Sequence, residues 1–154
     1  MCAPASRWLI SHDLLLPSAL REFQQELAGR LAMLDQPGVE VQALREKYGF
    51  TQEFMARALD LRRESLSRIE GGKVALTLPM LQRFTRVVTL ARGVREHLAW
   101  AEGRGNLPDE RHLDMLATSL RLDKPVADEV VLASMMSYDK KRRDTIGAMP
   151  PRRL

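Results

Sequence analysis

The sequence predicts an all-α protein, and three observations support this fold class. Only 5% of the 154 residues are aromatic, whereas strands favour aromatic and β-branched side chains. Apolar residues recur three and four positions apart in several segments, which is the spacing of one face of an α-helix. Signals typical of strands are sparse. The length suits one domain of good size, or a smaller domain with extensions.

The first expected helix covers residues 17–34. Pro17 and Ser18 suit its start, and Pro37-Gly38 is expected to stop it. Its apolar residues form one stripe with spacings of 3, 4, 4 and 3, made by Leu20, Phe23, Leu27, Leu31 and Leu34. Such a stripe packs either on the same chain or on a second copy of the chain, and both alternatives remain open.

Three short helices are expected next, at 39–48, 52–59 and 63–70. Val41, Leu44 and Tyr48 share one face of the first of them. Thr51 is a good N-cap for the second, because its hydroxyl can accept a free backbone N–H. A turn at 60–62 leads into the third helix, which Gly71-Gly72 is expected to end.

In the rest of the sequence, four more helical segments and a C-terminal tail are expected. Thr77 and Pro79 suit the start of a helix over 77–91, and a separate helix is expected at 92–102. The segment "GRGN" at 103–106 is the best candidate for a linker. Two further helices open at Pro108 and Pro125, with apolar faces made by Leu113, Leu116 and Leu120, and by Val126, Val130, Ala133 and Met136.

These signals divide the chain into four regions, and charge differs between them. The expected regions are an N-terminal helical extension at 1–38, a helix-turn-helix domain at 39–103, a helical region for dimerisation at 104–138, and a mobile basic tail at 139–154. Residues 39–95 hold 11 basic and 6 acidic residues, whereas 96–138 hold 4 and 8. The tail has a net charge of +4. A polyanionic partner would therefore meet 39–95 and the tail first.

Several classes of function are not supported by the residues present. Cys2 is the single cysteine, and His12, His97 and His112 share no ligand spacing, so we expect no metal site. No phosphate-binding loop occurs, since "GGK" at 71–73 lacks the other residues of that motif. No stretch approaches the ~18 apolar residues of a membrane span. We expect a cytoplasmic protein with no cofactor and no enzymatic activity.

Residues 51–72, "TQEFMARALDLRRESLSRIEGG", have the spacing of a helix-turn-helix motif. Ala56 is small enough for two helices to approach closely, and Leu61 can fill the junction at the turn. Leu66 and Ile69 are expected to face inward, which leaves Arg63, Glu64, Ser67 and Arg68 on the outer face. Such a helix fits a DNA major groove about 12 Å wide.

Residues 39–95 resemble the Xre-type, lambda-repressor-like helix-turn-helix family, which also includes Cro-like proteins. The pattern is carried, in order, by Arg45, Gly49, Thr51-Gln52, Met55-Ala56, Leu66-Ser67-Arg68-Ile69-Glu70 and Gly72. The resemblance implies a five-helix DNA-binding domain. It also implies that Gln52 contacts a phosphate, and that base edges are faced by Arg63, Glu64, Ser67 and Arg68. Arg62 and Lys73 complete the expected DNA-binding set, and Glu70 is expected to pair with Arg45 in a structural role.

The sequence departs from the family pattern at the turn and at the start of the third helix. Asp60 stands where the family usually has glycine, but aspartate tolerates left-handed backbone better than most residues. Arg62 replaces the usual Ser or Thr cap and cannot accept a backbone N–H, so we expect it to reach a phosphate instead. Two roles remain open for Glu64, which can accept from a cytosine amino group or offset neighbouring arginines.

These observations predict a sequence-specific, double-stranded DNA-binding transcriptional regulator that acts as a homodimer. Two copies would read a palindrome, and the helices of 104–138 are the favoured seam between them. The alternative is an adaptor whose helix-turn-helix domain binds protein, such as a co-activator or an antitoxin component. An antitoxin needs a toxin-binding surface, which the acidic 96–138 segment would supply.

Overall fold

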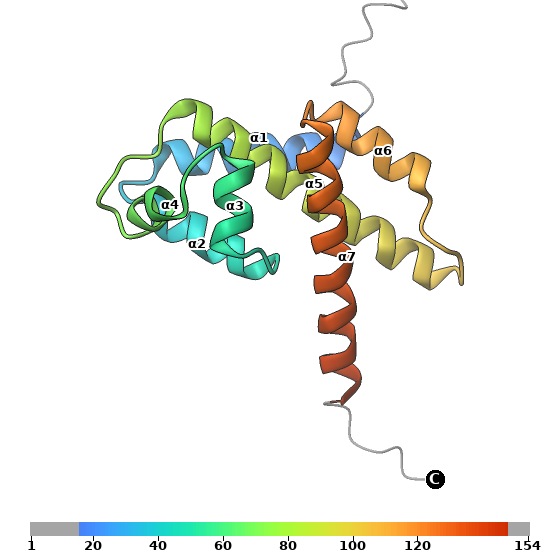
Figure 1. Cartoon of the computed structure of the whole chain (residues 1–154). Helices are drawn as coiled ribbons and strands as arrows, with labels where there is room; N and C mark the ends of the chain where they lie inside the picture. Colours follow the sequence, from blue (N-terminus) through green and yellow to red (C-terminus); the bar gives the residue numbers. More distant parts are fainter. Residues whose placement is uncertain (1–15, 148–154) are drawn as a thin grey trace, which may run out of the picture.

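The computed structural model describes residues 16–147, and seven helices and no strand occur in this part of the chain (Figure 1). The all-α prediction is therefore confirmed. The helices are α1 (Ser18–Met33), α2 (Pro37–Lys47), α3 (Gln52–Ala58), α4 (Arg63–Glu70), α5 (Leu78–Gly103), α6 (Glu110–Ser119) and α7 (Lys124–Gly147).

The long helix α5 organises the molecule. It packs most extensively against α7 and α1, while α2, α3 and α4 form a lobe beside its N-terminal half (Figure 1). Phe84, Val87 and Leu90 of α5 are fully buried. The apolar stripe of α1 follows the intrachain alternative, because Leu20 and Leu27 are buried in the same core. The helix-turn-helix lobe and the flanking helices therefore share one apolar core.

Local signals in the helix-turn-helix segment act as the sequence predicts. The Thr51 hydroxyl accepts the Phe54 N–H at 3.1 Å and caps α3. Asp60 takes the left-handed conformation with φ of 57°. The next N–H, of Leu61, donates to the Ala56 carbonyl at 2.8 Å and closes the turn. Arg62 precedes α4 without a side-chain cap.

The boundary between the first two helices differs from the prediction. Pro37 does not end α1, which stops at Met33, but occupies the first turn of α2. Proline suits this position because the first N–H groups of a helix have no intrahelical partner. Gly38 is needed because a Cβ there would lie 1.9 Å from the Ile69 carbonyl oxygen. Pro37-Gly38, which was expected to stop α1, is thus the start of α2. At this point α2 lies against the end of α4.

The two helices expected at 77–91 and 92–102 are one continuous helix, α5. Residues 39–103 therefore contain four helices instead of five. Gly93 does not break α5, because its role is to let other helices approach: a Cβ there would lie 3.0 Å from Leu20 and 3.1 Å from Leu116. Gly93 is thus a packing contact within one continuous helix.

The C-terminal helices pack on the rest of the chain. Leu113, Leu116, Leu120 and Val130 are buried in the common core. The rest of the chain, with α5 as the main partner, therefore covers most of these two faces, whereas Met136 is 64% exposed. The Arg95 guanidinium donates to the Ser137 hydroxyl at 2.7 Å, which joins α5 to α7.

The expected mobile tail is helical over its first part, because α7 continues to Gly147. Residues 148–154 lie outside the described part of the chain. None of the helices described between residues 16 and 147 has the length and apolar character needed to cross a membrane.

Candidate nucleic-acid interface

Helix α4 presents one buried face and one exposed face. Leu66 and Ile69 are buried, with exposed fractions of 0% and 1%. The four residues expected on the outer face are all exposed: Arg63, Glu64, Ser67 and Arg68. The lobe thus holds α4 with its polar side turned outward, as a helix that enters a groove requires.

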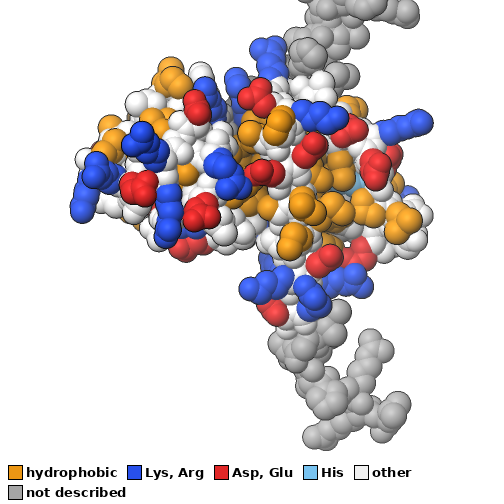
Figure 2. Space-filling model, in the orientation of Figure 1, with side chains coloured by type: hydrophobic (Ala, Val, Ile, Leu, Met, Phe, Trp, Pro, Cys, Tyr) orange, Lys and Arg blue, Asp and Glu red, His pale blue; other side chains and the backbone are white. Residues whose placement is uncertain are grey.

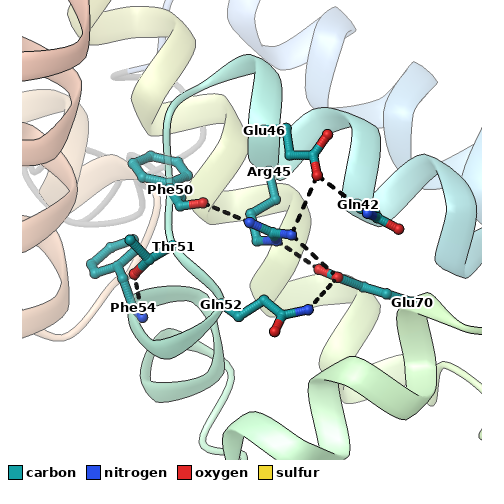
Figure 3. Close-up of polar contacts among 8 residues, drawn as sticks. All are labelled: Gln42, Arg45, Glu46, Phe50, Thr51, Gln52, Phe54 and Glu70. Carbon is teal, nitrogen blue, oxygen red and sulfur yellow. Dashed lines mark hydrogen bonds and ion pairs between the residues drawn. The ribbon is translucent and has the colours of Figure 1, made fainter.

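A buried ion pair fixes the position of α4 (Figure 3). The Nε of Arg45 on α2 lies 2.7 Å from Oε1 of Glu70, at the end of α4. A second nitrogen of Arg45 reaches the other carboxylate oxygen at 3.3 Å, and its third donates to the Phe50 carbonyl at 2.9 Å. Arg45 and Glu70 are 8% and 5% exposed, so each neutralises the other in a poorly solvated place. The implied structural pair is present.

Gln52 belongs to the same network. Its side-chain amide donates to Oε2 of Glu70 at 2.9 Å (Figure 3). The first turn of α3 is thereby tied to the last turn of α4 and, through Glu70, to α2. This contact was not predicted from the sequence, although a glutamine at the first position of α3 was the available signal. One amide hydrogen of Gln52 remains for another acceptor, such as the expected phosphate.

Basic side chains surround the outer face of α4. Arg62 lies directly before the helix, and Lys73 lies in the loop after it; both are exposed. Figure 2 shows Lys and Arg side chains along the outer side of the lobe of α2–α4, with a few acidic side chains between them. Arg63 lies 3.9 Å from Glu53 on α3, a distance that leaves its guanidinium free to turn outward.

Glu64 is in the first turn of α4 and makes no ion pair among the described residues. A carboxylate at a helix N-terminus is favoured by the partial positive charge of that end. Both roles left open for Glu64 therefore remain compatible with its position.

Residues 38–98 match a family model described as a helix-turn-helix domain. This segment is a helix-turn-helix domain. The match begins at the first turn of α2 and ends within α5, and it covers less than half of the chain. No curated protein and no solved structure matches the chain. Helix-turn-helix domains are typical of DNA-binding regulators, in which the second helix of the motif lies in the major groove.

Arg83 supports the turn of the helix-turn-helix domain, a role that was not predicted from the sequence. Arg83 on α5 donates to the Leu59 carbonyl at 3.2 Å and lies 3.9 Å from the Asp60 carboxylate. The last carbonyls of a helix have no intrahelical partner, so this guanidinium satisfies one of them at the end of α3.

Helix α7 contacts the helix-turn-helix domain but does not cover the exposed face of α4. Helix α7 reaches the helix-turn-helix domain through Arg57 of α3, which lies 3.2 Å from Glu129. Gly49, before α3, lies against Ser137 of α7, because a Cβ at Gly49 would come within 2.6 Å of that hydroxyl. These contacts occur away from the exposed residues of α4, so the interface and the C-terminal packing occupy different surfaces.

Proposed function

We propose that the protein is a sequence-specific, double-stranded DNA-binding transcriptional regulator of the Xre type, and that it acts as a homodimer without enzymatic activity. The observation that carries the proposal is the exposed face of α4. It bears Arg63, Ser67 and Arg68, while Leu66 and Ile69 fix the opposite face in the core. A helix held in this way presents its first turns to base edges.

The side chains around α4 divide into two roles under this proposal. Arg62 and Lys73 flank the helix and bind phosphates, which position the protein but carry no sequence information. Arg63 reads guanine with two hydrogen bonds, a contact that gives about 1–3 kcal/mol of discrimination. Gln52 adds a phosphate contact with the amide hydrogen that Glu70 does not use.

The salt dependence of binding tests the proposal. If a dimer neutralises roughly 6–8 phosphates, the plot of log K against log salt has a slope of about −5 to −7. Titrations of fragmented genomic DNA at several salt concentrations measure this slope. A slope near zero, or no binding at low salt, contradicts a DNA-binding role.

Selection from random DNA tests base reading. Arg63→Ala is expected to weaken binding to the preferred site by about 1–3 kcal/mol and to relax the selected motif at one position. Arg111→Ala on α6 is the control, since it removes an exposed arginine far along the chain from the helix-turn-helix domain. Recovery of an unchanged motif with Arg63→Ala rules out base reading by this residue.

The homodimer rests on a physical argument. One recognition helix covers a short half-site, whereas two copies held about 34–36 Å apart read a palindrome. Most of the residues first expected to form the seam are buried within the chain, but Met136 is not. Leu132 and Met136, four positions apart on α7, are still 60% and 64% exposed. We therefore assign the seam to this side of α7. Figure 2 shows hydrophobic side chains on the visible face around α7.

The seam is tested with a charged double variant, Leu132→Lys with Met136→Lys. Light scattering is expected to report a folded monomer for this variant and a dimer for the unchanged chain. Leu107→Lys is the control, because Leu107 is 89% exposed in the loop before α6. A variant that remains dimeric places the seam elsewhere. Deletion of 104–154 is unsuitable, because it would uncover the face of α5 that α7 buries.

An adaptor that binds protein is the second candidate function. The acidic side chains Glu53 and Glu64 lie beside Arg63 and reduce the net positive charge at the start of α4. A protein surface of mixed charge would tolerate them better than a polyanion does. Dimeric, folded protein that binds no DNA at low salt supports this candidate.

A further inference from the structure

A cavity of about 460 Å³ lies between the helix-turn-helix domain and the C-terminal helices. Its walls come from the end of α3 and the turn after it, from α5, and from the loop between α6 and α7. Six of the lining residues are charged: Arg57, Asp60, Arg83, Arg86, Arg121 and Asp123. None of them belongs to the exposed face of α4.

The charge of this cavity favours a small anion. Four guanidinium groups face two carboxylates, so the lining has a net charge of +2. Arg57 and Arg83 are held by protein partners, Glu129 at 3.2 Å and the Leu59 carbonyl at 3.2 Å. Among residues 16–145, whose side chains are described, Arg86 and Arg121 make neither an ion pair nor a side-chain hydrogen bond. Two donors with fork-shaped geometry are thus left for a ligand.

The backbone on both sides of the cavity is unusual. Asp60 and Arg121 have φ angles of 57° and 54°, and they are the non-glycine residues with positive φ in the described chain. Each follows the C-cap residue of a helix, Leu59 or Leu120, a position where glycine is usual because it has no Cβ. The chain has a charged side chain at both positions, in a conformation that costs free energy. Both of these side chains line the same cavity.

We propose that this cavity binds the dianionic phosphate group of a small molecule. Arginine forks match the oxygens of a phosphate in pairs, and the volume falls within the range of small-molecule pockets, about 300–1,000 Å³. Helix α7 begins at the cavity, with Asp123 and Val126 in its wall. The partial positive charge of that helix end adds to the attraction for an anion.

A small molecule fits the cavity better than a DNA strand does. Duplex DNA has one negative charge for about every 1.7 Å of its axis. A continuous row of phosphates would also meet the carboxylates of Asp60 and Asp123, whereas a single dianion balances the net charge of +2. The inference does not rest on the proposed function, because binding of the ligand is measured without DNA.

Two arginine variants and a matched control make the test specific. Arg86→Gln removes a cavity donor of similar length. Arg121→Gly also removes a donor, but it relieves a left-handed backbone, so the fold is expected to be retained or made more stable. Arg111→Gln on α6 makes the same change in charge outside the cavity.

The full chain is titrated calorimetrically with inorganic phosphate and with glycerol 3-phosphate, against sodium chloride of equal ionic strength. We expect saturable binding of one phosphate per chain, retained in Arg111→Gln and weakened at least about tenfold in Arg86→Gln and Arg121→Gly. Binding of inorganic phosphate alone identifies free phosphate as the ligand, and tighter binding of glycerol 3-phosphate identifies a phosphate monoester.

Three results would overturn the proposal. The first is the absence of saturable binding to the unchanged chain. The second is an equal phosphate affinity of Arg86→Gln, Arg121→Gly and Arg111→Gln, which indicates binding that does not depend on the arginines of the cavity. The third is a loss of DNA affinity in phosphate-free buffer, for Arg86→Gln and Arg121→Gly, as large as that for Arg62→Ala. That loss would assign the cavity to the DNA backbone.

Discussion

Removal of the Glu70 carboxylate is the most direct test of how α4 is held. Glu70→Ala leaves the Arg45 guanidinium in place but takes away both of its carboxylate contacts, at 2.7 and 3.3 Å. The Gln52 amide loses its acceptor as well. Since the Arg45 side chain is 10% exposed, the remaining charge cannot be fully hydrated without movement of α2.

The size of the effect follows from these contacts. Breaking a buried pair by removing one partner costs about 3–5 kcal/mol. Two remaining contacts reduce the cost for Arg45: the Phe50 carbonyl at 2.9 Å and the exposed Glu46 carboxylate at 3.7 Å. We therefore expect Glu70→Ala to lower the free energy of unfolding by about 3 kcal/mol. The total for a domain is about 5–15 kcal/mol, so the variant should fold but unfold easily.

Urea unfolding followed by circular dichroism measures this change. With an m value of about 1–3 kcal/mol per molar urea, the midpoint is expected to fall by about 1–3 M. Glu46→Ala is the control, because it removes a carboxylate from the exposed side of the same arginine and should cost under about 1 kcal/mol. Equal midpoints for Glu70→Ala and Glu46→Ala would refute the reasoning.

A double variant separates the charge from the contacts. Replacing both partners, Arg45→Met with Glu70→Met, removes the uncompensated charge and keeps apolar volume. We expect this double variant to be more stable than Glu70→Ala alone, although the Phe50 carbonyl and the Gln52 amide lose partners. A double variant less stable than Glu70→Ala shows that the hydrogen bonds, and not the buried charge, dominate.

Two further predictions concern a close helix contact and a histidine. Gly38→Ala is expected to lower the free energy of unfolding by about 3 kcal/mol or more, since its Cβ would lie 1.9 Å from the backbone oxygen of Ile69. Gly29 has open space around it, so Gly29→Ala should raise the free energy of unfolding by about 0.5–1 kcal/mol. Urea unfolding measures both changes. Burial, and then the neighbouring His112, lower the pKa of His97 below 6.5. The stability that neutral His97 contributes is therefore complete above pH 6.5 and is lost as the pH falls through the folded pKa. In His97→Gln, the free energy of unfolding is expected to depend less on pH than in the unchanged chain. An equal pH dependence in both proteins would exclude a contribution from His97.

The helix-turn-helix domain is readable from the sequence because its signals are local. The N-cap at Thr51, the turn at Asp60 and the spacing of Leu66 and Ile69 each act within a few residues. Periodicity and caps depend on the backbone nearby, so such elements appear in the sequence before any tertiary contact is known. The same reasoning placed Arg63 and its neighbours on the exposed face.

The parts that the sequence did not predict depend on distant contacts. The break expected between residues 91 and 92 is absent, and Gly93 lies against Leu20 and Leu116 instead. The apolar faces of α6 and α7 suggested a dimer seam, because their partner, α5, is identified only by the packing of the fold. Gln52 and Glu70 are 18 positions apart, and their hydrogen bond needs α3 and α4 in place.

The continuity of α5 has a mechanical consequence for the whole molecule. Its 26 residues span about 39 Å without a joint. One part of α5 packs against the helix-turn-helix domain and another against α7, so a rotation of α7 would be transmitted to α4. In a dimer joined through α7, the distance and the angle between the two copies of α4 would therefore be fixed. Inserting one base pair between half-sites twists them by about 35°, which such a stiff frame cannot follow without bending the DNA.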